Sequence, residues 1–342
     1  MSIGPLGSGS SRSELILFLA GGQGDPRSAP ADFRSHSEMM PARPGRHCAF
    51  VPEVARAGKG CVFMSDPRPL GVFDSGVGGL TVLRALRAAL PGEATVYLGD
   101  TARVPYGTRS AATVVKYALN NARTLIKQAD IKLLVIACNT VSAVALDALR
   151  ADLPIPVIGV IDAGARAALG ATSTKTPPCI AILSTAGTAR SGAYARALLR
   201  QGHTGTVVAV KAPLLVPLAE EGWTSGEVPR LVATRYLETL PIDVDIVVLG
   251  CTHYPLLAPV IQQALTALRR GAIVVDGAAA TAEEVKATLE ARGLFTPADH
   301  TPVHHRLLVT DAPEQMVALA GAFLGAPIDA AAVELVDVEM TA

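Results

Sequence analysis

Short runs of apolar residues alternate along most of this chain with longer stretches of helical periodicity. The first run, at 70–73, is followed by a leucine stripe from Leu80 to Leu90, whose spacing places these side chains on one helical face. Continuous apolar runs are typical of strands that are buried on both faces, as they are in parallel sheets. The alternation restarts near residue 179, so we expect two units of similar construction.

The pattern predicts an α/β fold built from doubly wound parallel sheets, with helices on both faces of each sheet. The predicted strands lie at 70–73, 95–98, 133–137, 157–160, 179–183, 207–210, 246–249, 273–275 and 307–309. The predicted helices lie near 80–90, 111–128, 142–151, 163–169, 189–202, 216–221, 227–240, 256–269, 278–292 and 313–324. Ligands of such folds bind beyond the carboxyl ends of the strands, so we expect the chemistry there.

Residues 1–64 differ from the rest because no hydrophobic period persists in them. They contain 9 Gly, 8 Ser and 6 Pro, a composition that buries too little apolar surface to offset its ordering entropy. We therefore predict a disordered N-terminal extension, in which we expect no role for Cys48 and Cys61. Met64 is one candidate for the natural start, and a genuine regulatory or targeting extension is the alternative.

Composition excludes several classes of protein. The chain has 30 Lys and Arg against 30 Asp and Glu, whereas a general affinity for nucleic acid or a membrane surface needs an excess of one sign. No apolar run reaches the roughly 18 residues of a membrane span. Five cysteines without a CxxC pair indicate neither a disulfide framework nor a structural zinc site. We expect a cytoplasmic protein with no metal, nucleic-acid or membrane partner.

Polar clusters follow several predicted strands. The glycines of DSGVGG at 74–79 let the backbone approach a ligand, although an ordinary turn capped by Ser75 is the alternative. The segment 99–107 holds Tyr106 between Pro and Gly, which a packed turn also explains. The segment 184–188 either caps the next helix or binds a carboxylate or amine.

Two strand ends resemble each other. LLVIACNT at 133–140 and IVVLGCTH at 246–253 each join an apolar strand to a small residue, a cysteine and two polar residues. One buried cysteine is usually a small hydrophobe. Cys138 and Cys251, at equivalent strand ends, instead indicate an internal repeat and a functional pair.

Three kinds of chemistry are open to such a pair. A disulfide needs sulfurs about 2.05 Å apart and is disfavoured in a reducing cytoplasm. Two cysteines and His253 make an incomplete structural zinc set. If each sulfur lies roughly 3–3.5 Å from one carbon, a thiolate on one face and a thiol on the other invert that centre without a cofactor.

The two-base scheme needs help, because a free thiol has a pKa near 8.5 and is mostly protonated at neutral pH. His253 is the candidate helper of Cys251, and Asp74 is the candidate partner of Cys138. Backbone N–H groups and hydroxyls beyond the strand ends would stabilise the carbanion.

Five motifs, in this order, carry a resemblance to a known family. They are GVFDSGVGGLTV at 71–82, YLGDTARVPYG at 97–107, IACNT at 136–140, VPLAEEGW at 216–223 and LGCTHYPLL at 249–257. Residues 68–330 resemble the glutamate racemases of the aspartate/glutamate racemase family. The resemblance implies cofactor-independent interconversion of L- and D-glutamate, supplying D-glutamate for peptidoglycan.

The resemblance also implies two similar α/β domains with the active site between them. The first domain would comprise 65–161 and 271–330, and the second, inserted domain 162–270. Residues 331–342 would form a C-terminal tail.

The resemblance implies a role for each matching site residue. Cys138 and Cys251 would be the catalytic acid/bases for D- and L-glutamate respectively, assisted by Asp74, His253 and Glu220. The implied substrate-binding residues are Asp74, Ser75, Tyr106, Gly107, Asn139, Thr140, Thr185, Thr252 and His253.

Two alternatives stay open. An aspartate racemase or another two-cysteine relative would use the same chemistry, and one methylene in a pocket is worth only about 1–3 kcal/mol. A non-catalytic amino-acid-binding or gyrase-regulating protein is the other, although binding alone needs no matched thiols. Glutamate is the expected small-molecule partner, and a homodimer is one option for the assembly.

Overall fold

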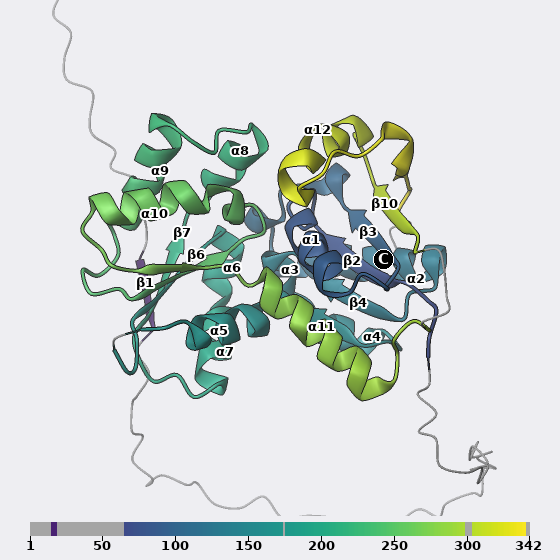
Figure 1. The fold of residues 1–342 in the computed structure, drawn as a ribbon, viewed down its shortest axis with the longest axis horizontal. Coiled ribbons are helices and arrows are strands. Elements are labelled where there is room, and N and C mark those ends of the chain that lie inside the picture. The colour runs from purple at the N-terminus through teal and green to yellow at the C-terminus, as the bar shows by residue number, and fades with distance from the viewer. Residues whose placement is uncertain (1–14, 19–64, 174, 298–302, 340–342) are drawn as a thin grey trace, which may run out of the picture. The chain divides into compact units, whose positions relative to one another are not determined.

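The computed structural model describes residues 15–18, 65–173, 175–297 and 303–339 (Figure 1). The strands in these residues form two sheets. The six-stranded sheet has the order β11-β10-β3-β2-β4-β5, and all its pairs are parallel. Its strands are β2 (Leu70–Asp74), β3 (Thr95–Gly99), β4 (Leu133–Ile136), β5 (Val157–Gly159), β10 (His305–Val309) and β11 (Val333–Leu335).

The five-stranded sheet has the order β1-β7-β6-β8-β9. Its strands are β1 (Leu15–Phe18), β6 (Ile180–Ser184), β7 (Val207–Lys211), β8 (Ile246–Gly250) and β9 (Ile273–Val275). The pairs among β6 to β9 are parallel, and β1 adds to the edge of β7 in the antiparallel direction. The predicted architecture of two parallel-sheet α/β domains is therefore confirmed.

Strand β1 differs from the disorder predicted for residues 1–64. It is a four-residue apolar segment, and its backbone pairs with the open edge of β7. That pairing is a tertiary contact which local composition does not reveal. The remainder of 1–64, with Cys48, Cys61 and Met64, lies outside the described residues.

Sheet membership also differs from the predicted domain limits in two places. β9 pairs with β8, so 273–275 belongs to the second sheet rather than to the first domain. β11 pairs with β10, so 333–335 extends the first sheet rather than lying in a tail. Both strands are three-residue edge strands without fully buried positions, and which sheet an edge strand joins depends on the neighbour available to it rather than on its own sequence. The domain division otherwise stays a prediction.

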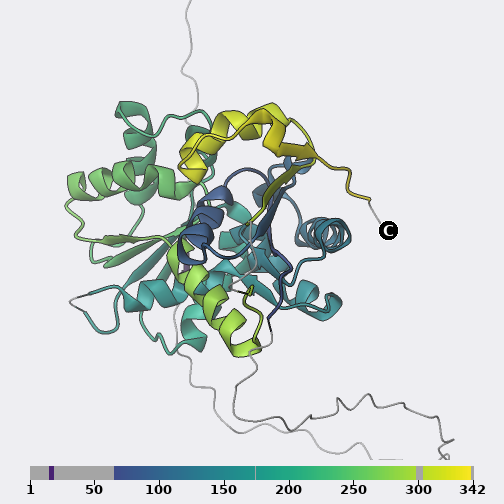
Figure 2. The same cartoon turned by 45° about the vertical axis from the view of Figure 1, so that its right-hand side comes forward.

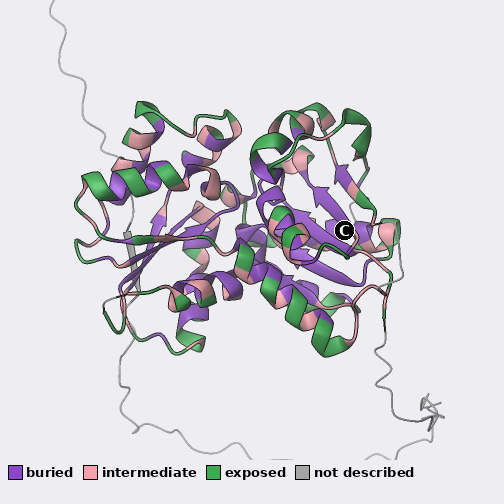
Figure 3. Ribbon diagram, in the orientation of Figure 1, coloured by how far each residue is buried: buried purple, intermediate pink, exposed green. Residues whose placement is uncertain are grey.

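Helices connect the strands and cover both sheets (Figures 1 and 2). They are α1 (Leu80–Ala89), α2 (Ala111–Ala129), α3 (Asn139–Val144), α4 (Leu146–Asp152), α5 (Val160–Gly170), α6 (Ala186–Ser191), α7 (Ala193–Arg200), α8 (Leu215–Glu220), α9 (Glu227–Leu237), α10 (Ala258–Ala267), α11 (Ala278–Arg292) and α12 (Pro313–Leu324). Figure 3 shows buried strands and exposed outer helix faces, as the hydrophobic pattern requires.

Two of the segments predicted to be helical each contain two helices. The helix predicted at 142–151 begins earlier, at Asn139, because Cys138 is extended and forms the N-cap of α3. The helix predicted at 189–202 is interrupted at Gly192, whose φ of 65° is left-handed and favours glycine.

Apolar packing joins the two domains. One cluster of buried side chains contains Val72 of β2 and Val247 of β8, and both are fully inaccessible to solvent. Helix α11 packs against α1, which follows β2, and against α5, which leads into β6. Within the described residues, no helix has both the length and the apolar character needed to cross a bilayer.

A buried ion pair fixes the amino-terminal edge of the six-stranded sheet. Lys132 Nζ lies 2.6 Å from Glu93 Oε2, and the exposed fractions of these side chains are 0% and 3%. The same ammonium donates to the Asp66 carbonyl and the Thr296 hydroxyl, whereas Thr296 donates to both oxygens of Glu93. The pair and its hydrogen bonds therefore join four segments that are distant in sequence.

Lys132→Ala should lower the free energy of unfolding by about 3–5 kcal/mol, because it leaves the Glu93 carboxylate buried without its cation. Urea denaturation provides the measurement. Lys127→Ala is the matched control, since Lys127 meets Glu339 at 3.4 Å in an exposed pair and its loss should change stability by less than about 1 kcal/mol. Equal losses in the two variants would contradict the assignment.

Candidate active site

A cavity of about 320 Å³ lies where the strands of both sheets end. Of the candidate residues named from the sequence, all but Asp74 line it. The lining residues are Ser75, Gly76, Val104, Pro105, Tyr106, Gly107, Thr108, Cys138, Asn139, Thr140, Thr185, Ala186, Pro213, Val216, Pro217, Glu220, Cys251, Thr252 and His253. The two cysteines follow β4 and β8, so each sheet contributes one thiol.

Asp74 ends β2 and is completely buried behind the cavity wall. Its Oδ2 accepts the Gly76 N–H at 2.9 Å, whereas its Oδ1 has no hydrogen-bond partner among the described residues. Burial raises the pKa of this carboxyl, and the positive charge of His253 partly opposes that effect. Asp74 is therefore not part of the cavity surface, and its charge affects the cavity-lining Cys138 electrostatically.

Cys138 is 6% exposed and lies at the N-cap of α3. Its Sγ is 3.5 Å from Ser75 Oγ. Burial, followed by the negative charge of Asp74, raises the pKa of this thiol to about 12, although contacts with Ser75 and the Val141 backbone favour the thiolate. Cys138 is therefore a protonated thiol at neutral pH in the absence of a ligand.

Cys251 has a different set of neighbours. His253 Nδ1 lies 3.8 Å from its Sγ, and His253 Nε2 lies 3.0 Å from Glu220 Oε1. Burial acts to lower the pKa of His253, but the hydrogen bonds to Cys251 and Glu220 outweigh it and raise the pKa to about 10. The ring is therefore an imidazolium at neutral pH, with one N–H toward the carboxylate and the other toward the sulfur.

Residues that follow strands of the six-stranded sheet pack against the His253 imidazole. A Cβ placed on Gly78 would lie 2.5 Å from His253 Nδ1 and 2.4 Å from Thr252 Oγ1, so only glycine fits. The Phe323 ring of α12 meets the imidazole edge-on, with 5.3 Å between centroids. Sequence reasoning missed Phe323, because an apolar residue on a late helix gives no local signal of a catalytic contact.

Three threonine hydroxyls form a second polar group beside the cavity. Thr140 Oγ1 lies 2.9 Å from Thr185 Oγ1 and 3.3 Å from Thr188 Oγ1, and the latter two are 3.2 Å apart. Thr140 and Thr185 line the cavity, whereas Thr188 is buried behind them. Thr188 falls in the segment 184–188 noted from the sequence, but its role as a hydroxyl partner depends on the tertiary contact.

Tyr106 lines the cavity without a free hydroxyl. Its hydroxyl donates to the buried carboxylate of Asp100, which also accepts from Asn121 and Thr310 and pairs with Arg103. Any contact between Tyr106 and a ligand therefore involves its ring or its backbone.

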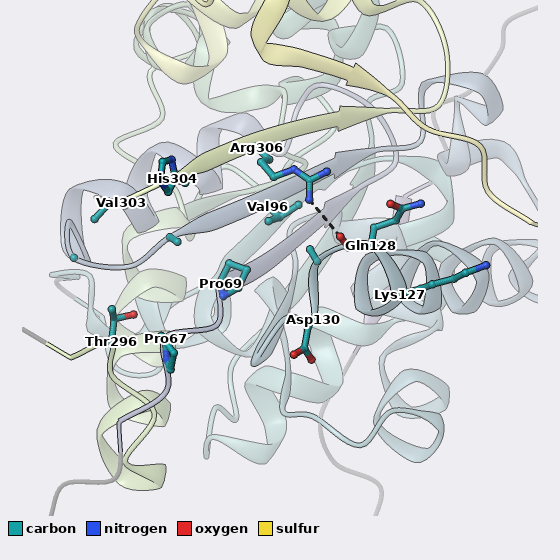
Figure 4. Close-up of a pocket in the computed structure, with 13 residues that line it drawn as sticks. Pro67, Pro69, Val96, Lys127, Gln128, Asp130, Thr296, Val303, His304 and Arg306 are labelled. Carbon is teal, nitrogen blue, oxygen red and sulfur yellow. Dashed lines mark hydrogen bonds between the residues drawn. The ribbon is translucent and has the colours of Figure 1, made fainter. Parts of the chain in front are cut away.

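A second cavity, of about 460 Å³, lies at the opposite end of the six-stranded sheet, where its strands begin (Figure 4). Pro69, Ala94 and His304 line it just before β2, β3 and β10 begin. It contains no cysteine, and the carboxyl ends of the strands face away from it. Among the described residues, no cluster of three or more His, Cys, Asp and Glu side chains is arranged to hold a metal ion.

The model of the family described as Asp/Glu/Hydantoin racemase matches residues 79–285, which is more than half of the chain. This chain belongs to that family. The match spans both cysteines and the strands that carry them, and it makes the protein an amino-acid racemase.

Similar proteins cover most of this racemase. It is 48% identical over 259 residues to a glutamate racemase of Geobacter metallireducens, an alignment of 75% of this chain and 93% of the relative. A solved glutamate racemase from Thermus thermophilus is 44% identical, with a TM-score of 0.70 and coverage of 81% of this chain and all of that one. A glutamate racemase from Francisella tularensis, solved with D-glutamate, is 34% identical with a TM-score of 0.72, over 80% and 99% of the two chains.

Glu220→Gln should lower the pKa of His253 below its value of about 10, because the variant removes the carboxylate that stabilises the imidazolium. NMR titration of the ring protons provides the measurement. His203 is an internal reference, since its pKa is lowered by burial and it is remote in sequence from this pair. An unchanged titration of His253 would show that Glu220 does not set its protonation.

Gly78→Ala should reduce the racemase kcat/KM roughly 10- to 100-fold, because the new methyl group displaces His253 or Thr252. Gly92→Ala is the matched control, since nothing lies within 4 Å of the added carbon there. Both enzymes are assayed at a temperature at which circular dichroism shows them folded. Full activity of the Gly78 variant would mean that the close approach is relieved without moving the site.

Proposed function

We propose that this racemase interconverts L- and D-glutamate by proton transfer at Cα between Cys138 and Cys251, without a cofactor. The observation that carries the proposal is that two buried cysteines, one from each sheet, line one cavity with different protonating neighbours. Glutamate is the proposed substrate because the similar proteins are glutamate racemases, one of them solved with D-glutamate and the Escherichia coli relative with L-glutamate.

The different neighbours of the two thiols support a direction of proton transfer for each of them. The imidazolium of His253 stabilises negative charge on Cys251, so this sulfur removes the Cα proton of L-glutamate. Cys138, which is a thiol at neutral pH, then donates its proton to the opposite face of the carbanion and forms D-glutamate. Afterwards Cys251 holds a proton and Cys138 is a thiolate, the protonation state that acts on D-glutamate.

Uncharged donors bind the two carboxylates in this scheme. None of the cavity-lining residues in the described part of the chain is Lys or Arg, and His253 is engaged by Glu220 and Cys251. The donors are then the hydroxyls of Ser75, Thr140 and Thr252, the Asn139 amide and backbone N–H groups. With neutral donors around the substrate, the negative charge that develops at Cα lies near fixed dipoles. These dipoles need no reorganisation during the reaction.

The role implied by the sequence resemblance completes the proposal: the D-glutamate supplies peptidoglycan synthesis in the cytoplasm. Aspartate is the alternative substrate, because the same thiols and dipoles would serve a side chain that is one methylene shorter.

Racemisation in D₂O tests the proposal. Purified, reduced protein without added pyridoxal phosphate or metal should deplete the circular dichroism of L-glutamate and place deuterium at Cα. L-Aspartate, assayed separately, should react much more slowly. Activity with aspartate alone would change the substrate and keep the chemistry, whereas no exchange with either would overturn the proposal.

Cys138→Ser and Cys251→Ser should each lower kcat by at least about 100-fold, because each removes one of the two acid/bases while leaving the carboxylate donors in place. Calorimetry should still detect glutamate binding. Cys179→Ser is the matched control, since Cys179 is a buried free cysteine outside the cavity. Normal turnover in either cavity variant would exclude the two-base scheme.

A further inference from the structure

We propose that Tyr194, which lies outside the cavity, is a positioning residue that orients the Asn139 amide so that its NH₂ group faces the substrate. This inference rests on the proposed function, because it assumes that a dicarboxylate occupies the cavity.

The contact joins the two halves of the protein. Tyr194 lies on α7, behind the threonine-lined wall, and its hydroxyl donates to Asn139 Oδ1 at 2.7 Å. Asn139 directly follows Cys138 and lines the cavity. The exposed fractions of Tyr194 and Asn139 are 5% and 7%, so water does not compete for this bond.

The chemistry of the hydroxyl makes the bond directional. Burial, followed by the negative charges of Asp276 and Cys251, raises the pKa of Tyr194, so its hydroxyl stays neutral and able to donate. A tyrosine hydroxyl can donate or accept, and here it donates to Oδ1, an orientation in which the NH₂ group of the amide turns the other way. The NH₂ group is then available to the cavity, where no lysine or arginine offers an alternative donor.

The opposite orientation would be unfavourable for an anionic ligand. It would present the amide oxygen to the substrate carboxylates, replacing an attractive contact with a repulsive one. An unrestrained asparagine can exchange these two orientations through rotation about its terminal side-chain bond. Tyr194 removes that freedom before the substrate arrives, which lowers the ordering required on binding.

The lack of a side chain at Gly164 leaves space for the Tyr194 hydroxyl. A Cβ on Gly164 of α5 would lie 3.0 Å from Tyr194 Oη and 3.2 Å from its Cε1. Glycine at 164 therefore leaves the ring free to reach Asn139. A methyl group there would move the hydroxyl by a few tenths of an ångström, which is a second way to disturb the same bond.

Tyr194→Phe removes the hydroxyl and keeps the ring. We expect the KM for both L- and D-glutamate to rise about fivefold, with kcat changed less than twofold, because one neutral hydrogen bond orients a binding group and touches no reacting atom. Gly164→Ala should change KM in the same direction by a smaller factor. Tyr236→Phe is the matched control, since that buried tyrosine hydroxyl meets the backbone N–H of Leu214, and its KM should not change.

Asn139→Ala and the double variant decide between positioning and simple stabilisation. If Tyr194 acts through Asn139, the double variant should bind glutamate no more weakly than Asn139→Ala alone. Additive losses, or an unchanged KM in Tyr194→Phe, would overturn the inference, as would a lower melting temperature with normal KM. The dissociation constant of glutamate, measured by calorimetry, tests the same coupling even if the wild-type protein fails to racemise, so the two proposals can fail separately.

Discussion

The candidate site depends on one buried positive charge, that of the His253 imidazolium. An imidazolium is stable inside a protein only where fixed negative groups replace the water it has lost. His253 meets this condition because Glu220 faces one ring nitrogen and Cys251 faces the other. Gly78 and Phe323 then close the remaining sides with backbone and an aromatic edge. The ring and the two groups that raise its pKa follow strands of the five-stranded sheet, whereas Gly78 and Phe323, which pack against it, follow strands of the six-stranded sheet.

The two thiols have different neighbours. Burial, followed by the negative charge of Asp74, raises the pKa of Cys138, which therefore keeps its proton, whereas Cys251 faces the imidazolium of His253. An internal repeat would give two equivalent cysteines, and equivalent groups would both be protonated or both ionised. In the proposed reaction, different neighbours would make an acid and a base of two groups in a symmetric framework, so that a proton could enter one face of a carbon as another leaves the opposite face.

Much of this was predictable from the sequence, because parallel strands that are buried on both faces are continuous apolar runs and their polar ends are easily located. The equivalence of Cys138 and Cys251 was visible for that reason, as were Asn139 and His253 immediately after them. Contacts from distant segments were not predictable: Phe323 and Tyr194 are apolar or aromatic residues of amphipathic helices, and nothing local separates them from core residues. The edge strands β1 and β11 were not predicted, and β9 was predicted as a strand but placed in the wrong domain, since the pairing of such strands is decided by an available neighbour rather than by periodicity.

The asymmetry extends to how the substrate is held. A pocket that bound two carboxylates with arginines would place strong positive charge beside Cα and would also bind the ground state tightly. Neutral amides and hydroxyls bind more weakly, but their orientation is fixed by second partners, as Asn139 is by Tyr194 and Thr185 is by Thr188. Because fixed dipoles favour charge wherever it develops, donors of this kind would, in the proposed reaction, stabilise the carbanion more than the bound amino acid. In that scheme the charged His253 and Glu220 act on Cys251, and the substrate carboxylates are left to oriented neutral groups.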